Sequence, residues 1–136
     1  MTHLAARASS VQSVPIWLSE GFADYVAYRA TPVPTSIVAA DIFDDVRDGD
    51  VPKKLPDDAD FDAETGDIAS AYEGAWLACR MIAERWGERA LVRFYADMAD
   101  SSGPGWPEEV KTSLGISQRQ LVRQWRQYVA TEAAAS

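Results

Sequence analysis

Apolar residues recur at three- and four-residue intervals along most of the chain, the spacing of one face of an α-helix. This pattern predicts helices at about 16–30, 35–47, 67–86 and 88–99, a short one from Pro107 to about Gly115, and a last one after Ser117. Residues 1–13 also have the composition of a helix. No segment is a confident strand. We therefore expect an all-α fold, a compact bundle of six to seven helices.

Prolines, glycines and capping residues mark the ends of these helices. Pro15 suits the first turn of the 16–30 helix, and Gly87 is a natural stop for the fourth helix. Ser117 is expected to cap the last helix, and Thr35 or Ser36 to cap the third. The apolar side of that third helix should hold Ile37, Val38, Ile42 and Val46. The tail, 131–136, is expected to fray.

The segment 67–86 has the clearest helical pattern. It forms one apolar stripe, made of Ile68, Tyr72, Ala75, Trp76, Cys79, Ile82, Ala83 and Trp86. Cys79 is expected to be a small buried residue of this stripe. Because it is the single cysteine, neither an intrachain disulfide nor a cysteine-rich zinc site can form.

Composition and charge narrow the classes of function. The 136 residues are 47% hydrophobic and fit a single helical domain, 1–136. The net charge of -8 argues against nucleic acid as a partner, because phosphate contacts need a basic surface. Most of this charge lies in 41–67, and we expect 48–66 within it to be a solvated acidic loop, with calcium binding as the alternative. The sequence contains neither a signal peptide nor an apolar run long enough for a membrane span.

Candidate chemistry centres on the stretch 15–26, where Glu20 stands among large apolar residues and Asp24 follows one helical turn later. A carboxylate in such a setting needs a partner, because burying an unpaired charge is costly. The one histidine, His3, lies upstream. Histidine and glutamate on consecutive helices are ligands that a catalytic zinc ion uses, together with a bound water.

The residues Trp17-Leu18-Ser19-Glu20-Gly21-Phe22-Ala23-Asp24-Tyr25 resemble the Trp-Leu-x-Glu-Gly-x-Ala-x-Tyr segment of gluzincin zinc metallopeptidases. Thr2-His3-Leu4 looks like the end of their His-Glu-x-Thr-His motif. The resemblance implies that Glu20 and His3 are zinc ligands and that peptide or protein is the substrate. It also implies that Asp24 hydrogen-bonds a ligand histidine and fixes its orientation.

A second segment, Ala71-Tyr72-Glu73-Gly74-Ala75, resembles the Tyr-Glu-(Lys)-Gly-Ala segment of the aminopeptidase branch. The resemblance implies that Tyr72 is catalytic and donates a hydrogen bond to the oxyanion of the tetrahedral intermediate. The bundle as a whole would then correspond to the C-terminal helical subdomain of such a peptidase. Peptidases of this type are often secreted or membrane-anchored, and the compartment of this chain is left open.

The sequence departs from the family pattern at its start. If His3 is the second histidine, the first histidine and the general-base glutamate would lie before Met1. The chain is then a truncated peptidase or an inactive descendant, and we expect zinc binding to be weak or absent and hydrolysis to be lost. A truncated first helix would expose apolar surface and favour self-association. The alternative is a non-catalytic helical binding or regulatory module derived from a peptidase.

Each candidate residue also has a structural interpretation. His3 could be an ordinary helix residue, and Asp24 a surface residue. Glu20 could be the buried ion-pair partner of Arg29 or Arg80, and Tyr72 a packed core tyrosine. The tryptophans are expected to anchor the core.

Overall fold

A computed structural model describes residues 14–62, 68–100 and 106–136 of the chain. These ranges contain seven α-helices and no strand, which confirms the all-α prediction. The elements are α2 (Ile16–Ala30), α3 (Thr35–Val38), α4 (Ala40–Arg47), the 3₁₀ turn η1 (Asp58–Phe61), α5 (Ile68–Trp86), α6 (Glu88–Ala99), α7 (Trp106–Leu114) and α8 (Gln118–Ala135). The predicted helical stretch in 1–13 lies outside the described residues. Within the described ranges, no helix is long and apolar enough to cross a membrane.

Several predicted helix ends are confirmed. The bounds of α2 and α6 coincide with the predicted ones, and α5 ends at Trp86, before Gly87. Gly87 has a φ of 99°, a left-handed conformation that favours glycine. Ser117 caps α8 as predicted, because its hydroxyl accepts a hydrogen bond from the Gln120 N–H while the Gln120 side chain accepts one from the Ser117 N–H.

The predicted 35–47 helix is two helices, α3 and α4, which meet at Ala39. Ala39 is fully buried and has φ -107° and ψ 27°, outside the helical region. The cap prediction for this segment was wrong, because Pro34 precedes α3 and no side chain caps it. Ile37 was also misplaced, since it is 66% exposed, whereas Ile42 is buried.

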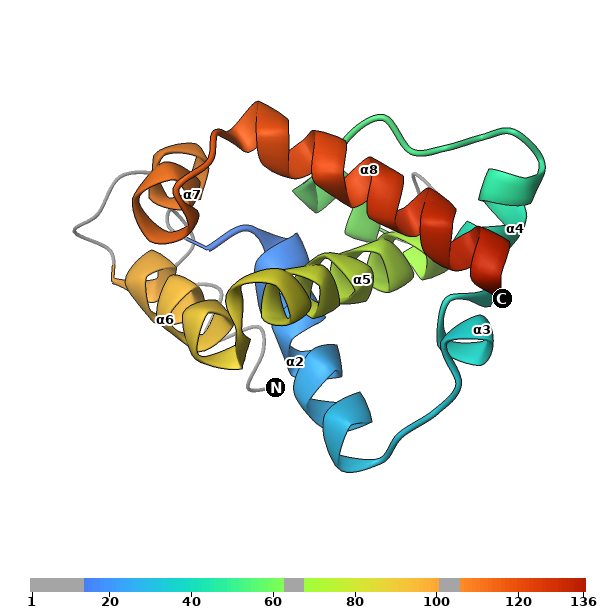
Figure 1. The fold of residues 1–136 in the computed structure, drawn as a ribbon, viewed down its shortest axis with the longest axis horizontal. Coiled ribbons are helices and arrows are strands. Elements are labelled where there is room, and N and C mark those ends of the chain that lie inside the picture. The colour runs from blue at the N-terminus through green and yellow to red at the C-terminus, as the bar shows by residue number, and fades with distance from the viewer. Residues whose placement is uncertain (1–13, 63–67, 101–105) are drawn as a thin grey trace.

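Helix α5 is the centre of the fold (Figure 1), and α2, α4, α6 and α8 all pack against it. The buried residues of α5 lie on several sides of the helix. They are Ala71, Gly74, Ala75, Trp76, Leu77, Ala78, Cys79, Met81 and Ile82. This arrangement is wider than the predicted stripe because neighbours cover several sides of α5. Figure 1 shows α2 crossing α5, and α8 running back along α5 in the opposite direction.

The acidic 48–66 segment contains the short turn η1. Asp57 and Asp60 form a reciprocal cap at its start, and Lys54 donates to both carboxylates at 2.8 and 3.2 Å. The hydrogen bond with Lys54 lowers the pKa of Asp57 below its usual value. The Asp58 carboxylate accepts a hydrogen bond from the Ile16 N–H at 3.2 Å, so η1 lies at the start of α2.

The C-terminal segment is helical as far as Ala135 and does not fray as predicted. Ala133 is buried, and its carbonyl accepts a hydrogen bond from Arg47 of α4 at 3.2 Å. Glu132 pairs with Arg80 of α5 at 2.8 Å. These contacts stabilise the end of α8 and offset the conformational entropy that is lost when a chain terminus becomes ordered.

Candidate functional site

Glu20 lies in the first half of α2, on the part of this helix that is buried. Its neighbours Trp17, Leu18 and Gly21 are buried too, and Glu20 itself is 8% exposed. In the part of the chain that the structure describes, Glu109 is the other buried acid, and it accepts a hydrogen bond from Ser113 at 2.6 Å. Glu20 is thus a buried acid among apolar side chains, as its place in the sequence suggested.

Gly21 fixes how close α2 comes to α5. A Cβ built on Gly21 would lie 2.3 Å from the carbonyl oxygen of Ala75 and 2.9 Å from the sulfur of Cys79. No other residue type fits there without displacing one of the two helices. The contact between the backbones of Gly21 and Ala75 therefore fixes the position of α2, and with it the position of Glu20.

Asp24 is half-buried and lies one helical turn after Glu20. Its negative charge interacts with the Cys79 thiol of α5. Burial raises the pKa of the Cys79 thiol, and the charge of Asp24 raises it further. The Cys79 thiol also points to the Leu18 carbonyl at 3.9 Å. Asp24 thus interacts electrostatically with the buried α2–α5 contact, and it is half-buried.

Tyr72 lies near the start of α5, one turn before Ala75, and is half-buried. Its ring packs edge-on against Phe61 of η1, with 5.1 Å between ring centroids. Since η1 also contacts the start of α2 through Asp58 and Ile16, Tyr72 lies towards the N-terminal end of α2. This position agrees with the packed interpretation and leaves the catalytic one as a proposal.

The two residues after Tyr72 have structural roles that the sequence did not indicate. The Glu73 carboxylate accepts a hydrogen bond from the Ile42 N–H at 2.8 Å, in the first turn of α4. Gly74 accepts a hydrogen bond from the Trp125 indole at 3.0 Å, and a Cβ on it would meet that ring at 3.1 Å. The Tyr-Glu-Gly-Ala segment therefore joins α5 to α4 and α8.

The arginines proposed as ion-pair partners of Glu20 pair with other acids. Arg29 forms an ion pair with Glu88, whose carboxylate also accepts a hydrogen bond from Tyr25 at 3.1 Å. Arg80 pairs with Glu84 at 3.2 Å and with Glu132 at 2.8 Å. Both arginines therefore have acid partners of their own, and the ion-pair interpretation of Glu20 stays a prediction.

The two predicted zinc ligands, His3 and Glu20, come from different segments of the chain. His3 lies outside the described residues, and within those residues no three His, Cys, Asp or Glu side chains are grouped as a metal ion would need. The donor type of Glu20 fits zinc, but a complete site would need ligands from outside the described ranges.

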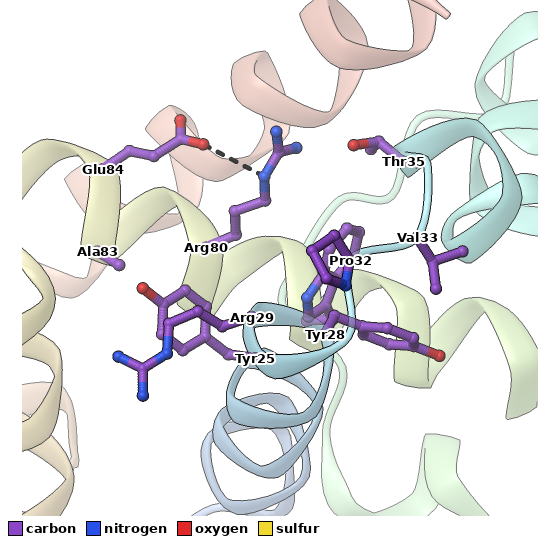
Figure 2. A pocket seen from close by; sticks show the side chains of 10 residues that line it. Tyr25, Tyr28, Arg29, Pro32, Val33, Thr35, Arg80, Ala83 and Glu84 are labelled. Carbon is purple, nitrogen blue, oxygen red and sulfur yellow. Dashed lines mark ion pairs between the residues drawn. The ribbon is translucent and has the colours of Figure 1, made fainter.

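A pocket of about 310 Å³ lies beyond the C-terminal half of α2. Figure 2 shows Tyr25, Tyr28 and Arg29 of α2 on one side, the segment 32–35 on another, and side chains of α5 behind them. Trp76 forms much of its aromatic wall, since Tyr28 packs edge-on against it at 5.6 Å and Arg80 lies 5.6 Å from its ring centroid. Of these aromatic residues, the sequence analysis had indicated Trp76 as a core anchor.

Comparisons with known proteins gave no match to a protein-family model, a curated protein or a solved structure. The interpretation of the site therefore depends on the residues and contacts described above. Among these, the buried Glu20, the glycine contact beside it and the nearby Asp24 are the strongest.

Proposed function

We propose that this chain is part of a zinc-dependent metallopeptidase of gluzincin type and that Glu20 is its glutamate ligand. The observation that supports this best is the burial of Glu20 beside Gly21, where the backbones of α2 and α5 come too close for a side chain. A metal ligand must be held within a fraction of an ångström, and a rigid helix-to-helix contact provides that.

The proposed roles follow from the chemistry of each side chain. A zinc ion bound there would activate a water for attack on a peptide bond. Glu20 supplies a carboxylate oxygen from a fixed helix, and Asp24, one turn away, accepts a hydrogen bond from the ring of a ligand histidine and orients it. Tyr72 donates a hydrogen bond to the developing oxyanion.

The printed sequence contains one histidine, so a site with two histidines needs a second one from elsewhere. Adding His-Glu directly before Met1 creates His-Glu-Met-Thr-His, which ends at His3. In this arrangement the added histidine and His3 share one helical face, and the added glutamate is the general base. The extended chain is therefore a direct test of the proposal.

The test measures zinc affinity by competition with a chromophoric chelator, for the extended chain and for its Glu20→Gln variant. We expect tight binding by the extended chain, and for Glu20→Gln a loss of about a hundredfold or more, since even a residue that only supports a ligand is worth about 10–100-fold. Glu109→Gln is the matched control, because it removes a carboxylate that is equally buried but remote from the proposed site. Zinc binding that is unchanged in Glu20→Gln, or equally weakened in Glu109→Gln, would overturn the ligand assignment.

The second candidate is a non-catalytic helical binding module, and the pocket in Figure 2 favours it. Tyr25, Tyr28 and Trp76 offer aromatic faces, and Arg80 adds a cation at the edge. Such a lining suits a ligand with an aromatic or apolar body and a polar end. Under this proposal the His-Glu extension confers neither tight zinc binding nor hydrolysis of a fluorogenic peptide, while Trp76→Ala weakens binding of an aromatic probe to the pocket.

A further inference from the structure

Three arginines lie on one face of α8, in a chain whose overall charge is strongly negative. Arg119, Arg123 and Arg126 are spaced by four and three residues, so their side chains share a face. Lys53, from the segment before η1, lies opposite them. Together with Gln118 and Val122 they line a pocket of about 410 Å³, which we call the basic pocket.

No carboxylate lines the basic pocket. Its four cations form no ion pair within the described residues, whereas Arg29, Arg47, Lys54 and Arg80 each pair with an Asp or Glu. The contrast is sharpest between neighbours, because Lys54 is held by Asp57 and Asp60 while Lys53 faces the arginines of α8. Within the described residues, therefore, no ion pair neutralises the positive charge of the pocket.

The two walls of the basic pocket are joined before any ligand binds. The Nε–H of Arg126 donates a hydrogen bond to the Pro52 carbonyl at 2.8 Å, which ties the chain beside Lys53 to α8. Leu55 and Pro56, just beyond Lys53, are buried and anchor that segment to the core. A pocket that is already assembled loses less conformational entropy on binding.

The start of α8 adds to the attraction for an anion. The capping box occupies the Gln120 N–H, and the N–H groups of Gln118 and Arg119 have no acceptor inside the helix. The positive end of the helix dipole therefore lies beside Gln118 and Arg119, which line the pocket. The three arginines cover about 10 Å along the helix axis, at 1.5 Å per residue.

We infer that the basic pocket binds a small anion carrying two or more phosphate groups. Arginine forks bind phosphate oxygens in pairs, and two phosphate groups fit the span from Arg119 to Arg126. The pocket volume suits a small ligand rather than a long polyanion. A long polyanion would also meet repulsion from the negative charge of the rest of the chain.

The test titrates the full chain with inorganic pyrophosphate by calorimetry at fixed ionic strength. The double variant Arg119→Gln/Arg123→Gln is compared with Arg89→Gln/Arg93→Gln on α6, because both pairs are exposed, four residues apart and free of ion pairs in the described structure. We expect about a hundredfold loss of affinity in the α8 variant, about tenfold for each charged contact, and less than about a twofold loss in the α6 variant.

Equal losses in the two variants would show that pyrophosphate responds only to net charge, and would overturn the proposal. Failure of the wild-type chain to bind pyrophosphate at millimolar concentration would do the same. A glutamate-rich peptide is titrated in parallel. If the peptide binds and loses affinity in the α8 variant while pyrophosphate does not bind, the pocket is an interface for acidic protein segments and not a phosphate site. Thermal melting of each variant by circular dichroism checks that the fold is intact.

Discussion

Gly21 of α2 lies directly against the Ala75 carbonyl group of α5, with room for a hydrogen atom but not for a methyl group. A Cβ there would approach the Ala75 oxygen to 2.3 Å. Glu20 precedes this contact in the chain and Cys79 flanks it on α5. The position of the candidate ligand and the packing of two helices therefore depend on the same glycine.

Gly21→Ala is expected to lower the free energy of unfolding by about 3 kcal/mol or more, because the new methyl group forces two backbones apart. Gly49→Ala is the control, since Gly49 has a φ of 89° but nothing within 4 Å of an added Cβ. That variant should lose only about 1–2 kcal/mol from backbone strain. Urea unfolding followed by circular dichroism measures both. A smaller loss at Gly21 than at Gly49 would contradict the close contact.

Glu73→Ala is expected to destabilise the fold by about 1–2 kcal/mol, because the Ile42 N–H in the first turn of α4 loses its acceptor. Glu73→Gln keeps an acceptor oxygen and should recover most of this loss. The same urea unfolding experiment compares the two variants. If both lose the same stability, the hydrogen bond to α4 is not what Glu73 contributes.

Stability should fall at alkaline pH through Cys79. Burial holds the pKa of this thiol above its usual value near 9, so above that pH the unfolded chain loses the proton and the folded chain keeps it. The contribution is complete below about pH 9 and is lost as pH rises, by up to about 1.4 kcal/mol per pH unit. Tyr128, whose pKa burial also raises from its usual value near 10, adds a loss of the same sign.

The Cys79→Ala variant separates the contribution of the thiol to alkaline destabilisation from the contributions of other groups such as Tyr128. Unfolding free energies from pH 8 to 11 should fall less steeply in the variant than in the wild type, with the difference beginning near pH 9. Parallel curves above pH 9 would be evidence against a thiol that stays protonated in the folded chain.

Tyr72→Phe distinguishes packing from catalysis. The variant keeps the ring against Phe61, so its loss of stability should be about 1 kcal/mol at most. In the chain extended with His-Glu, loss of an oxyanion donor should lower kcat for a fluorogenic peptide by about 100-fold or more, with KM nearly unchanged. A kcat within twofold of the parent would leave Tyr72 with a packing role only.

Much of the fold followed from local signals in the sequence. Pro15, Gly87 and Ser117 act within one turn of chain, so the limits of α2, α5, α6 and the start of α8 were predictable. The break at Ala39 was not, because alanine favours helix and the neighbouring residues carry no glycine or proline that would mark a break. Likewise, the burial of α5 on several sides reflects neighbours that are distant in sequence.

The candidate site was predictable only where it lies within one segment. Glu20 and Asp24 share α2, and their spacing alone placed them one turn apart. The contact of Gly21 with Ala75 and the hydrogen bond of Glu73 with Ile42 join separate helices, so spacing along the chain gives no sign of them. The spacing of Arg119, Arg123 and Arg126 indicated part of the basic pocket. That Lys53 also lines this pocket was not predictable, because Lys53 is distant from α8 in the sequence.

The contact between Arg47 and the Ala133 carbonyl has a consequence for biosynthesis. A growing polypeptide emerges from the ribosome N-terminus first, and α4 is complete long before residue 133 exists. Until α8 has been translated, Gly74 lacks its Trp125 partner and one side of α5 is uncovered. During that interval the apolar surface of α5 that α8 later covers stays exposed to solvent. A chaperone that binds apolar surfaces would have its longest opportunity to bind the nascent chain then.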